Sequence, residues 1–72
     1  MTEQEKLAII EECMDLDEGT ISPSDELANF EEWDSLAALS FIAAMAEKFD
    51  KKIEAADIKA LVTVADALKL MD

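Results

Sequence analysis

The residues best suited to chemistry are Asp34, Ser35 and Leu36, which stand where a long acidic stretch ends and an apolar segment begins. The carboxylate of Asp34 is a good helix N-cap, because it can accept hydrogen bonds from the free N–H groups of a first turn. Ser35 would then occupy the first helical position, with its hydroxyl directed outward at the positive end of the helix dipole. Since helix N-termini favour anions, this serine is suited to receive a phosphate-linked group. The alternative is a capping pair without chemistry.

The amino acids that the chain lacks limit the reactions and the metal sites that it could support. The 72 residues contain no histidine, so neither Ser35 nor Cys13 has the usual imidazole base. A zinc site made of histidine and cysteine is excluded for the same reason. Cys13 is the single cysteine, so it forms no disulfide within the chain, and its apolar surroundings predict a buried thiol. We therefore expect no catalytic activity and, apart from the calcium alternative considered below, no metal site.

The chain is strongly acidic, with 18 acidic residues against 6 basic ones and a net charge of −12. Residues 1–36 hold twelve of the acidic residues and one lysine, while residues 37–72 are close to neutral. Such a chain lacks the positive footprint that nucleic-acid binding needs and should be steered toward basic patches on partners. No apolar run approaches the about 18 residues of a membrane span, and no signal segment is visible. We expect a cytoplasmic monomer that forms one domain over residues 1–72.

The segments before the candidate site are predicted to be a helix and a long loop. Apolar periodicity predicts a helix over about residues 3–15, opened by a capping box of Thr2 and Glu5. Between residues 15 and 33 the apolar periodicity is lost, and turn-forming residues take its place. A loop of this length is unusual in a small domain unless it is tied down. We expect three apolar anchors in the core: Ile21, Leu27 and Phe30.

A second helix, from Ser35 to about residue 50, is predicted to carry the candidate site at its start. Its apolar residues recur at helical spacing, which predicts one face packed against the body. This face comprises Leu36, Leu39, Ile42, Ala43, Ala46 and Phe49. Phe41 and Met45 widen the stripe beyond what a surface helix needs. Such a helix either lies at the centre of the bundle or keeps an apolar patch for a partner.

Two further helices complete the predicted fold. A short one is expected around residues 55–60, and a last one runs to about residue 71 after a second capping pair, Thr63 and Asp66. Ile53, Ile58 and Leu61 are expected to point inward. The fold class is therefore all-α, a small four-helix bundle with three longer helices, one short helix and a long first loop.

Taken together, these residues closely resemble the acyl carrier protein family. The resemblance covers nearly the whole chain and rests on four features: Asp34-Ser35-Leu36, an apolar helix ending Glu47-Lys48-Phe49-Asp50, Ile53, and Thr63-Val64-Ala65-Asp66-Ala67-Leu68. It implies that Ser35 is the attachment site of 4′-phosphopantetheine, transferred from coenzyme A by a separate phosphopantetheinyl transferase, with Asp34 and Leu36 beside it. It also implies that the arm carries an acyl group as a thioester between enzymes that load and use it.

The chain departs from the fatty-acid carriers of this family in two respects. Two residues before the aspartate they usually have glycine, whereas this chain has Glu32, followed by Trp33. They also tend to line the helix after the serine with acidic residues, whereas this chain keeps only Glu47. These departures favour a freestanding carrier of a specialised pathway. That pathway could be fatty-acid-like biosynthesis, polyketide biosynthesis or another specialised biosynthesis. The residues expected to contact partners are Trp33, Glu32, Ala38, Leu39, Ile42 and Glu47. For Trp33 the alternative is that its side chain packs over the loop.

Three other interpretations stay open. An aminoacyl or peptidyl carrier would use the same attachment. An unmodified acidic helical module would dock on a basic or apolar partner without any need for the Ser35 hydroxyl. A calcium site is suggested by Asp15, Asp17 and Glu26, which fall at positions 1, 3 and 12 of an EF-hand loop, but Thr20 stands where that loop needs glycine.

Overall fold

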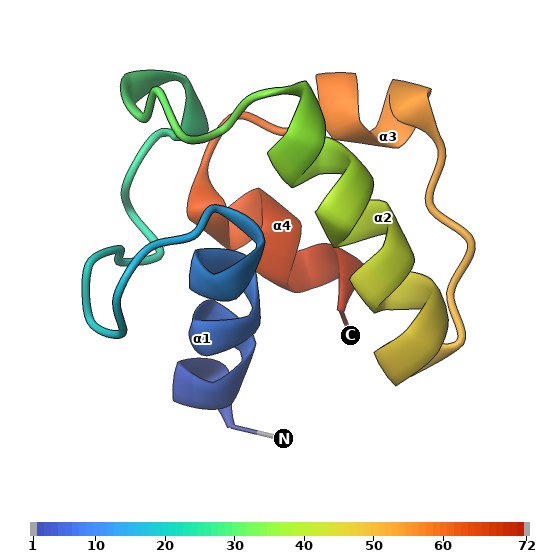
Figure 1. Ribbon diagram of the computed structural model, residues 1–72, viewed down its shortest axis with the longest axis horizontal. Coiled ribbons are helices and arrows are strands. Elements are labelled where there is room, and N and C mark those ends of the chain that lie inside the picture. Colours follow the sequence, from blue (N-terminus) through green and yellow to red (C-terminus); the bar gives the residue numbers. More distant parts are fainter. Residues whose placement is uncertain (1, 72) are drawn as a thin grey trace.

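The computed structural model describes residues 2–71, so the two ends of the predicted domain, residues 1 and 72, lie outside it. Within this range the chain forms four α-helices and no strands: α1 (Glu3–Cys13), α2 (Ser35–Phe49), α3 (Ala55–Lys59) and α4 (Val64–Leu70) (Figure 1). A short 3-10 helix, η1 (Leu27–Asn29), interrupts the connection between α1 and α2. The predicted all-α fold, with three longer helices, one short helix and a long first loop, is confirmed.

Local hydrogen bonds explain where α1 and α4 begin. The Thr2 hydroxyl accepts the N–H of Glu5 at 3.2 Å, and the Glu5 carboxylate accepts the N–H of Thr2 at 3.0 Å. At α4 the Asp66 carboxylate accepts the N–H groups of Thr63 and Val62, and these bonds hold the pKa of Asp66 below its ordinary value. Both predicted capping boxes are therefore confirmed.

The end of α1 differs from the prediction. The helix ends at Cys13, two residues before the predicted boundary. Asp15 has a φ of 58°, in the left-handed region, and this conformation turns the chain out of the helix. Asp50 has a φ of 53° and ends α2 in the same way.

The core lies where α1, α2, α4 and the first loop meet, and α1 packs against both α2 and α4. Its largest fully buried side chains come from each of these parts: Ile10, Leu27, Phe41, Met45 and Val64. Ile53 is also buried, as predicted, while Ile58 and Leu61 are half-buried and pack against the core.

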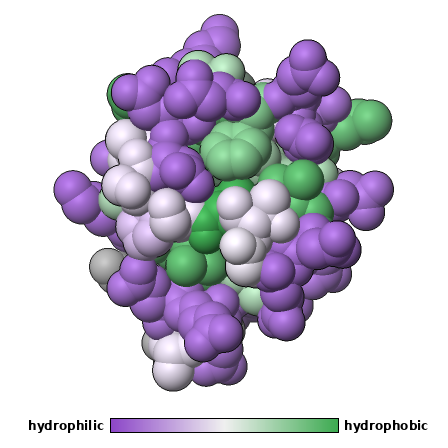
Figure 2. Space-filling model, turned by 90° about the vertical axis from the view of Figure 1, so that its left-hand side faces the viewer, coloured by the Kyte–Doolittle hydropathy of each residue, from purple (hydrophilic) through white to green (hydrophobic). Residues whose placement is uncertain are grey.

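The long first loop is tied down at two places. The Glu11 carboxylate of α1 is only 2% exposed and accepts the N–H groups of Thr20 and Ile21 at 2.8 and 3.1 Å. Further along, three backbone hydrogen bonds of 2.9 Å join residues 23–27 to residues 62–65. Ile21 and Leu27 are buried as predicted, and Phe30 is half-buried. The side of the molecule on which this loop lies is largely hydrophilic, with an apolar area in its middle (Figure 2).

The face of α2 that packs against the body is not the predicted one. Ala37, Phe41 and Met45 are buried, whereas Leu36 and Leu39 are 75% and 62% exposed. Among the other residues assigned to the packed face, Ala43 and Ala46 are exposed, while Ile42 and Phe49 are half-buried. Both stripes are apolar, and at about 100° per residue their centres lie about 150° apart around the helix. The position of the neighbouring elements therefore decides which stripe is buried.

Candidate functional site

The candidate site lies at the N-terminus of α2, where Ser35 is the first helical residue and is exposed. Asp34 has an extended backbone, and its Oδ1 accepts the N–H of Ala37 at 3.0 Å. The Asp34 carbonyl oxygen accepts the N–H of Ala38 at 3.0 Å, which closes the first helical turn. The predicted N-cap is therefore confirmed, and it fixes Ser35 at the start of the helix.

Two backbone donors lie next to the Ser35 hydroxyl. Within residues 2–71, the N–H groups of Ser35 and Leu36 donate to no protein acceptor. Free N–H groups at a helix N-terminus stabilise an anion, typically by about 0.3–1 kcal/mol. The exposed carboxylates of Glu31, Glu32 and Asp34 oppose this effect because they repel a negative charge. The site therefore suits a phosphate that is covalently held better than one that is free.

Trp33 joins this site to the core. Its ring packs edge-to-face on Phe41, with the ring centroids 5.9 Å apart and an interplanar angle of 77°. The side chain is half-buried and lies against the core cluster. Such contacts favour the interpretation that Trp33 positions the segment before Ser35. Its role as a partner contact stays a prediction.

The other residues predicted to contact partners differ in their accessibility. Leu39, Glu32 and Glu47 are exposed, whereas Ala38 and Ile42 are half-buried. Leu36 was predicted to face the body, but it is directed to solvent beside Ser35. The sequence did not distinguish these residues because their apolar character fits either face of the helix.

Cys13 is half-buried, not fully buried as predicted. Burial raises the pKa of its thiol, the nearby Glu12 carboxylate raises it further, and Lys48 opposes both effects. A thiol with a raised pKa stays protonated at neutral pH, and the thiolate is the reactive form. The position of Cys13 therefore fits a packing role.

The predicted acidic positions of a calcium loop do not come together. Across the described residues, no group of three or more His, Cys, Asp or Glu side chains is placed to hold a metal ion. Asp15, Asp17 and Glu26 are thus not arranged as the ligands of an EF-hand. No helix of residues 2–71 has the length and apolar character needed to cross a membrane.

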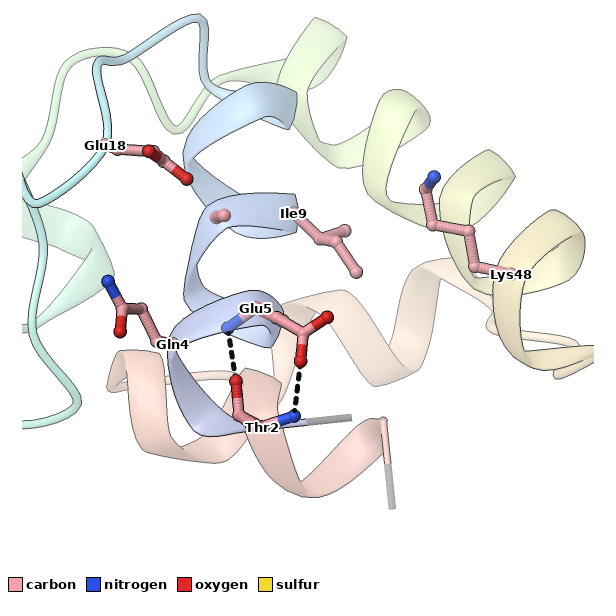
Figure 3. A pocket seen from close by; sticks show the side chains of 7 residues that line it. Thr2, Gln4, Glu5, Ile9, Glu18 and Lys48 are labelled. Atoms are coloured by element: carbon pink, nitrogen blue, oxygen red, sulfur yellow. Dashed lines mark hydrogen bonds between the residues drawn. The ribbon is translucent and has the colours of Figure 1, made fainter.

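A hollow of about 670 Å³ lies at the start of α1 and faces the C-terminal part of α2 (Figure 3). Its lining residues are Thr2, Gln4, Glu5, Ala8, Ile9, Glu18 and Lys48. The capping hydrogen bonds between Thr2 and Glu5 lie within it, and Lys48 approaches from α2 (Figure 3). Two of its polar residues are therefore already engaged in starting α1, and Ser35 is not part of the lining.

Comparison with known families identifies this type of domain. A family model described as "Phosphopantetheine attachment site" matches residues 7–71, a range that contains the N-terminus of α2 and all four helices except the first turn of α1. No curated protein and no solved structure matched the chain. Because the match covers nearly the whole chain, this protein belongs to the phosphopantetheine attachment family, whose carrier domains bear a 4′-phosphopantetheine prosthetic group.

Proposed function

We propose that Ser35 is the residue to which 4′-phosphopantetheine is attached. The observation that carries this proposal is that Ser35 is exposed and occupies the first position of α2, directly after the Asp34 cap. The chain has three other serines, Ser22, Ser24 and Ser40. Ser22 and Ser24 lie in the first loop, and Ser40 lies in the middle of α2. Ser35 alone combines exposure with the free N–H groups of a helix N-terminus.

The chain's own contribution is to present the attached group. The attached arm supplies a terminal thiol that holds an acyl group as a thioester. The N–H groups of Ser35 and Leu36 are available to phosphate oxygens, and the Trp33–Phe41 contact keeps the start of α2 fixed on the core. A tethered cargo has a high effective concentration at the active site of a docked partner, so the carrier needs no catalytic group of its own.

An acyl cargo is the form of this function that we favour. A hollow of about 220 Å³ lies between α2 and the segment that follows it, and its lining is Ile42, Ala46, Asp50, Lys51, Lys52 and Ile53. Its isoleucine and alanine side chains give it an apolar wall suited to a short hydrocarbon chain. Ile42 stands seven residues after Ser35, which corresponds to about 10 Å along the helix axis.

The partners implied by this function are a phosphopantetheinyl transferase and the enzymes that load and use the acyl group. We infer a specialised pathway, because Glu32 stands where fatty-acid carriers usually have glycine and the exposed side of α2 carries leucine and alanine. A single domain, a monomeric state and a cytoplasmic location stay predictions from the sequence.

The test is modification in vitro. Coenzyme A and a broad-specificity phosphopantetheinyl transferase should add the mass of one arm to the wild-type protein, and Ser35→Ala should abolish the addition. Ser40→Ala is the matched control, because it removes an exposed serine from the same helix and should leave the modification intact. Intact-protein mass spectrometry gives the readout. Unmodified wild-type protein, with a transferase that modifies other carriers, would contradict the proposal and favour an unmodified interaction module.

A further inference from the structure

Trp33 is the residue through which the segment around Ser35 reaches the core. Among residues 31–36, the five other side chains are exposed, whereas Trp33 is half-buried and lies against the core cluster. Its N–H donates to the Phe30 carbonyl oxygen at 3.2 Å, and the Phe30 N–H donates to the carbonyl oxygen of the buried Leu27 at 3.1 Å. Two turn hydrogen bonds and one side chain therefore fix the chain just before Ser35.

The residue on which Trp33 packs is itself held firmly. Phe41 lies within α2 and is completely buried, and its ring meets the Trp33 ring edge-to-face at a centroid distance of 5.9 Å. Aromatic pairs in this arrangement are favourable beyond the area that they bury. Ser35 lies between the two residues in the sequence, so the ring contact ties the chain before Ser35 to the chain after it.

The transfer reaction depends on how the Ser35 hydroxyl is oriented. The Ser35 oxygen forms a bond to the pantetheine-bearing phosphorus of coenzyme A. The bond from that phosphorus to the bridging oxygen of the pyrophosphate breaks, and adenosine 3′,5′-bisphosphate leaves. The hydroxyl proton goes to a base that the transferase supplies. A reacting group that is misplaced by about 1 Å can slow such a step by about 10²-fold.

We propose that Trp33, through its contact with Phe41, is a positioning residue that sets the turnover rate of phosphopantetheine transfer to Ser35. The ring contact holds the backbone of residues 33–35 in one conformation, so that the hydroxyl approaches the phosphorus in one direction. This role differs from that of a partner contact, because a partner contact would act on the binding of the transferase and not on turnover. The inference rests on the proposed attachment at Ser35.

The test is steady-state kinetics of a broad-specificity phosphopantetheinyl transferase, with coenzyme A and the full chain as substrates. Trp33→Leu keeps an apolar side chain but removes the ring contact, so it should lower kcat about tenfold and change KM by less than about twofold. Trp33→Phe retains a ring and should restore kcat to within about threefold of the wild type. Phe30→Leu is the matched control, because Phe30 is also a half-buried aromatic residue of the first loop packed against the core. It should leave kcat within about twofold of the wild type.

A second measurement asks whether the effect passes through the ring contact. The Trp33→Leu/Phe41→Leu double variant should be no slower than the slower of its two single variants, because both substitutions remove the same contact. Losses that multiply would contradict this. Trp33 is the only tryptophan of a chain without tyrosine, so its fluorescence reports on this ring alone. Quenching by acrylamide should increase in Phe41→Leu, and unchanged quenching would show that Phe41 does not hold the ring.

The outcomes separate this inference from the proposal on which it rests. If the transferase fails to modify the wild-type protein, the attachment at Ser35 is wrong. If it modifies the wild type, and Trp33→Leu raises KM at an unchanged kcat, the attachment stands and Trp33 is a partner contact. Unchanged constants, or an equal loss of kcat in Phe30→Leu, would also overturn the positioning role. Circular dichroism checks that each variant keeps its helices, and Trp33→Phe provides the same comparison of kcat with KM if Trp33→Leu unfolds.

Discussion

The two apolar sides of α2 differ in what covers them. Ala37, Phe41 and Met45 are 2% exposed or less and form part of the core, whereas Leu36 and Leu39 face the solvent. Both sides have apolar residues at helical spacing, so hydrophobicity does not separate them. The difference lies in their neighbours, since side chains of α1, α4 and Trp33 pack on the Phe41 side. One apolar side of α2 therefore joins the helix to the body, while the other stays accessible to solvent.

Truncation of one large side chain on each side of α2 should reveal this difference most strongly. Phe41→Ala should destabilise the fold by about 3–5 kcal/mol, because it leaves a cavity in a fully buried position. This is a large part of the stability of so small a domain. Leu39→Ala should change the free energy of unfolding by less than about 0.5 kcal/mol. Urea unfolding followed by circular dichroism measures both, and equal losses would refute the assignment of the two sides.

Enlarging an alanine on each side should give a smaller contrast. Ala37→Leu should cost about 1–3 kcal/mol, because Ala37 is 2% exposed and a larger side chain there must displace its buried neighbours. Ala43→Leu adds a larger side chain to the exposed side of α2 and should leave stability within about 0.5 kcal/mol of the wild type. The readout is the unfolding midpoint in urea. A destabilised Ala43→Leu variant would show that this side of α2 is packed against the body.

Removal of the N-cap should have the smallest of the three destabilising effects. Asp34→Ala should cost about 1 kcal/mol, because the N–H of Ala37 loses its acceptor. Asp34→Asn is the control, since asparagine caps a helix about as well as aspartate. Thermal unfolding compares the two variants, and an Asn variant as unstable as the Ala variant would show that the charge of Asp34 matters more than its hydrogen bond.

The features that depend on nearby residues could be predicted from the sequence. The capping boxes of α1 and α4 and the Asp34 cap each use residues within three positions of one another, so the sequence contains the whole interaction. The four helices and the exposed Ser35 follow from these starts and from apolar periodicity. The capping box at Glu54 and Asp57, which opens α3, was missed because glutamate is a rare N-cap residue.

The features that depend on distant neighbours could not be predicted. Glu11 was assigned no role, yet its carboxylate is buried and holds the N–H groups of Thr20 and Ile21, nine and ten residues further along. No local pattern marks such a contact. The prediction of which side of α2 is packed was wrong for the same reason. The positions of α1 and α4 decide which of the two apolar stripes is buried. The accessibility of Leu36 and Leu39 therefore emerged only from the structure.

The most direct test of the whole account is peptide mapping by tandem mass spectrometry after incubation with coenzyme A and the transferase. The expected result is a single phosphopantetheine arm on Ser35, in protein whose other serines remain unmodified. An arm attached to Ser22, Ser24 or Ser40, or no arm on protein whose α2 is intact by circular dichroism, would contradict it.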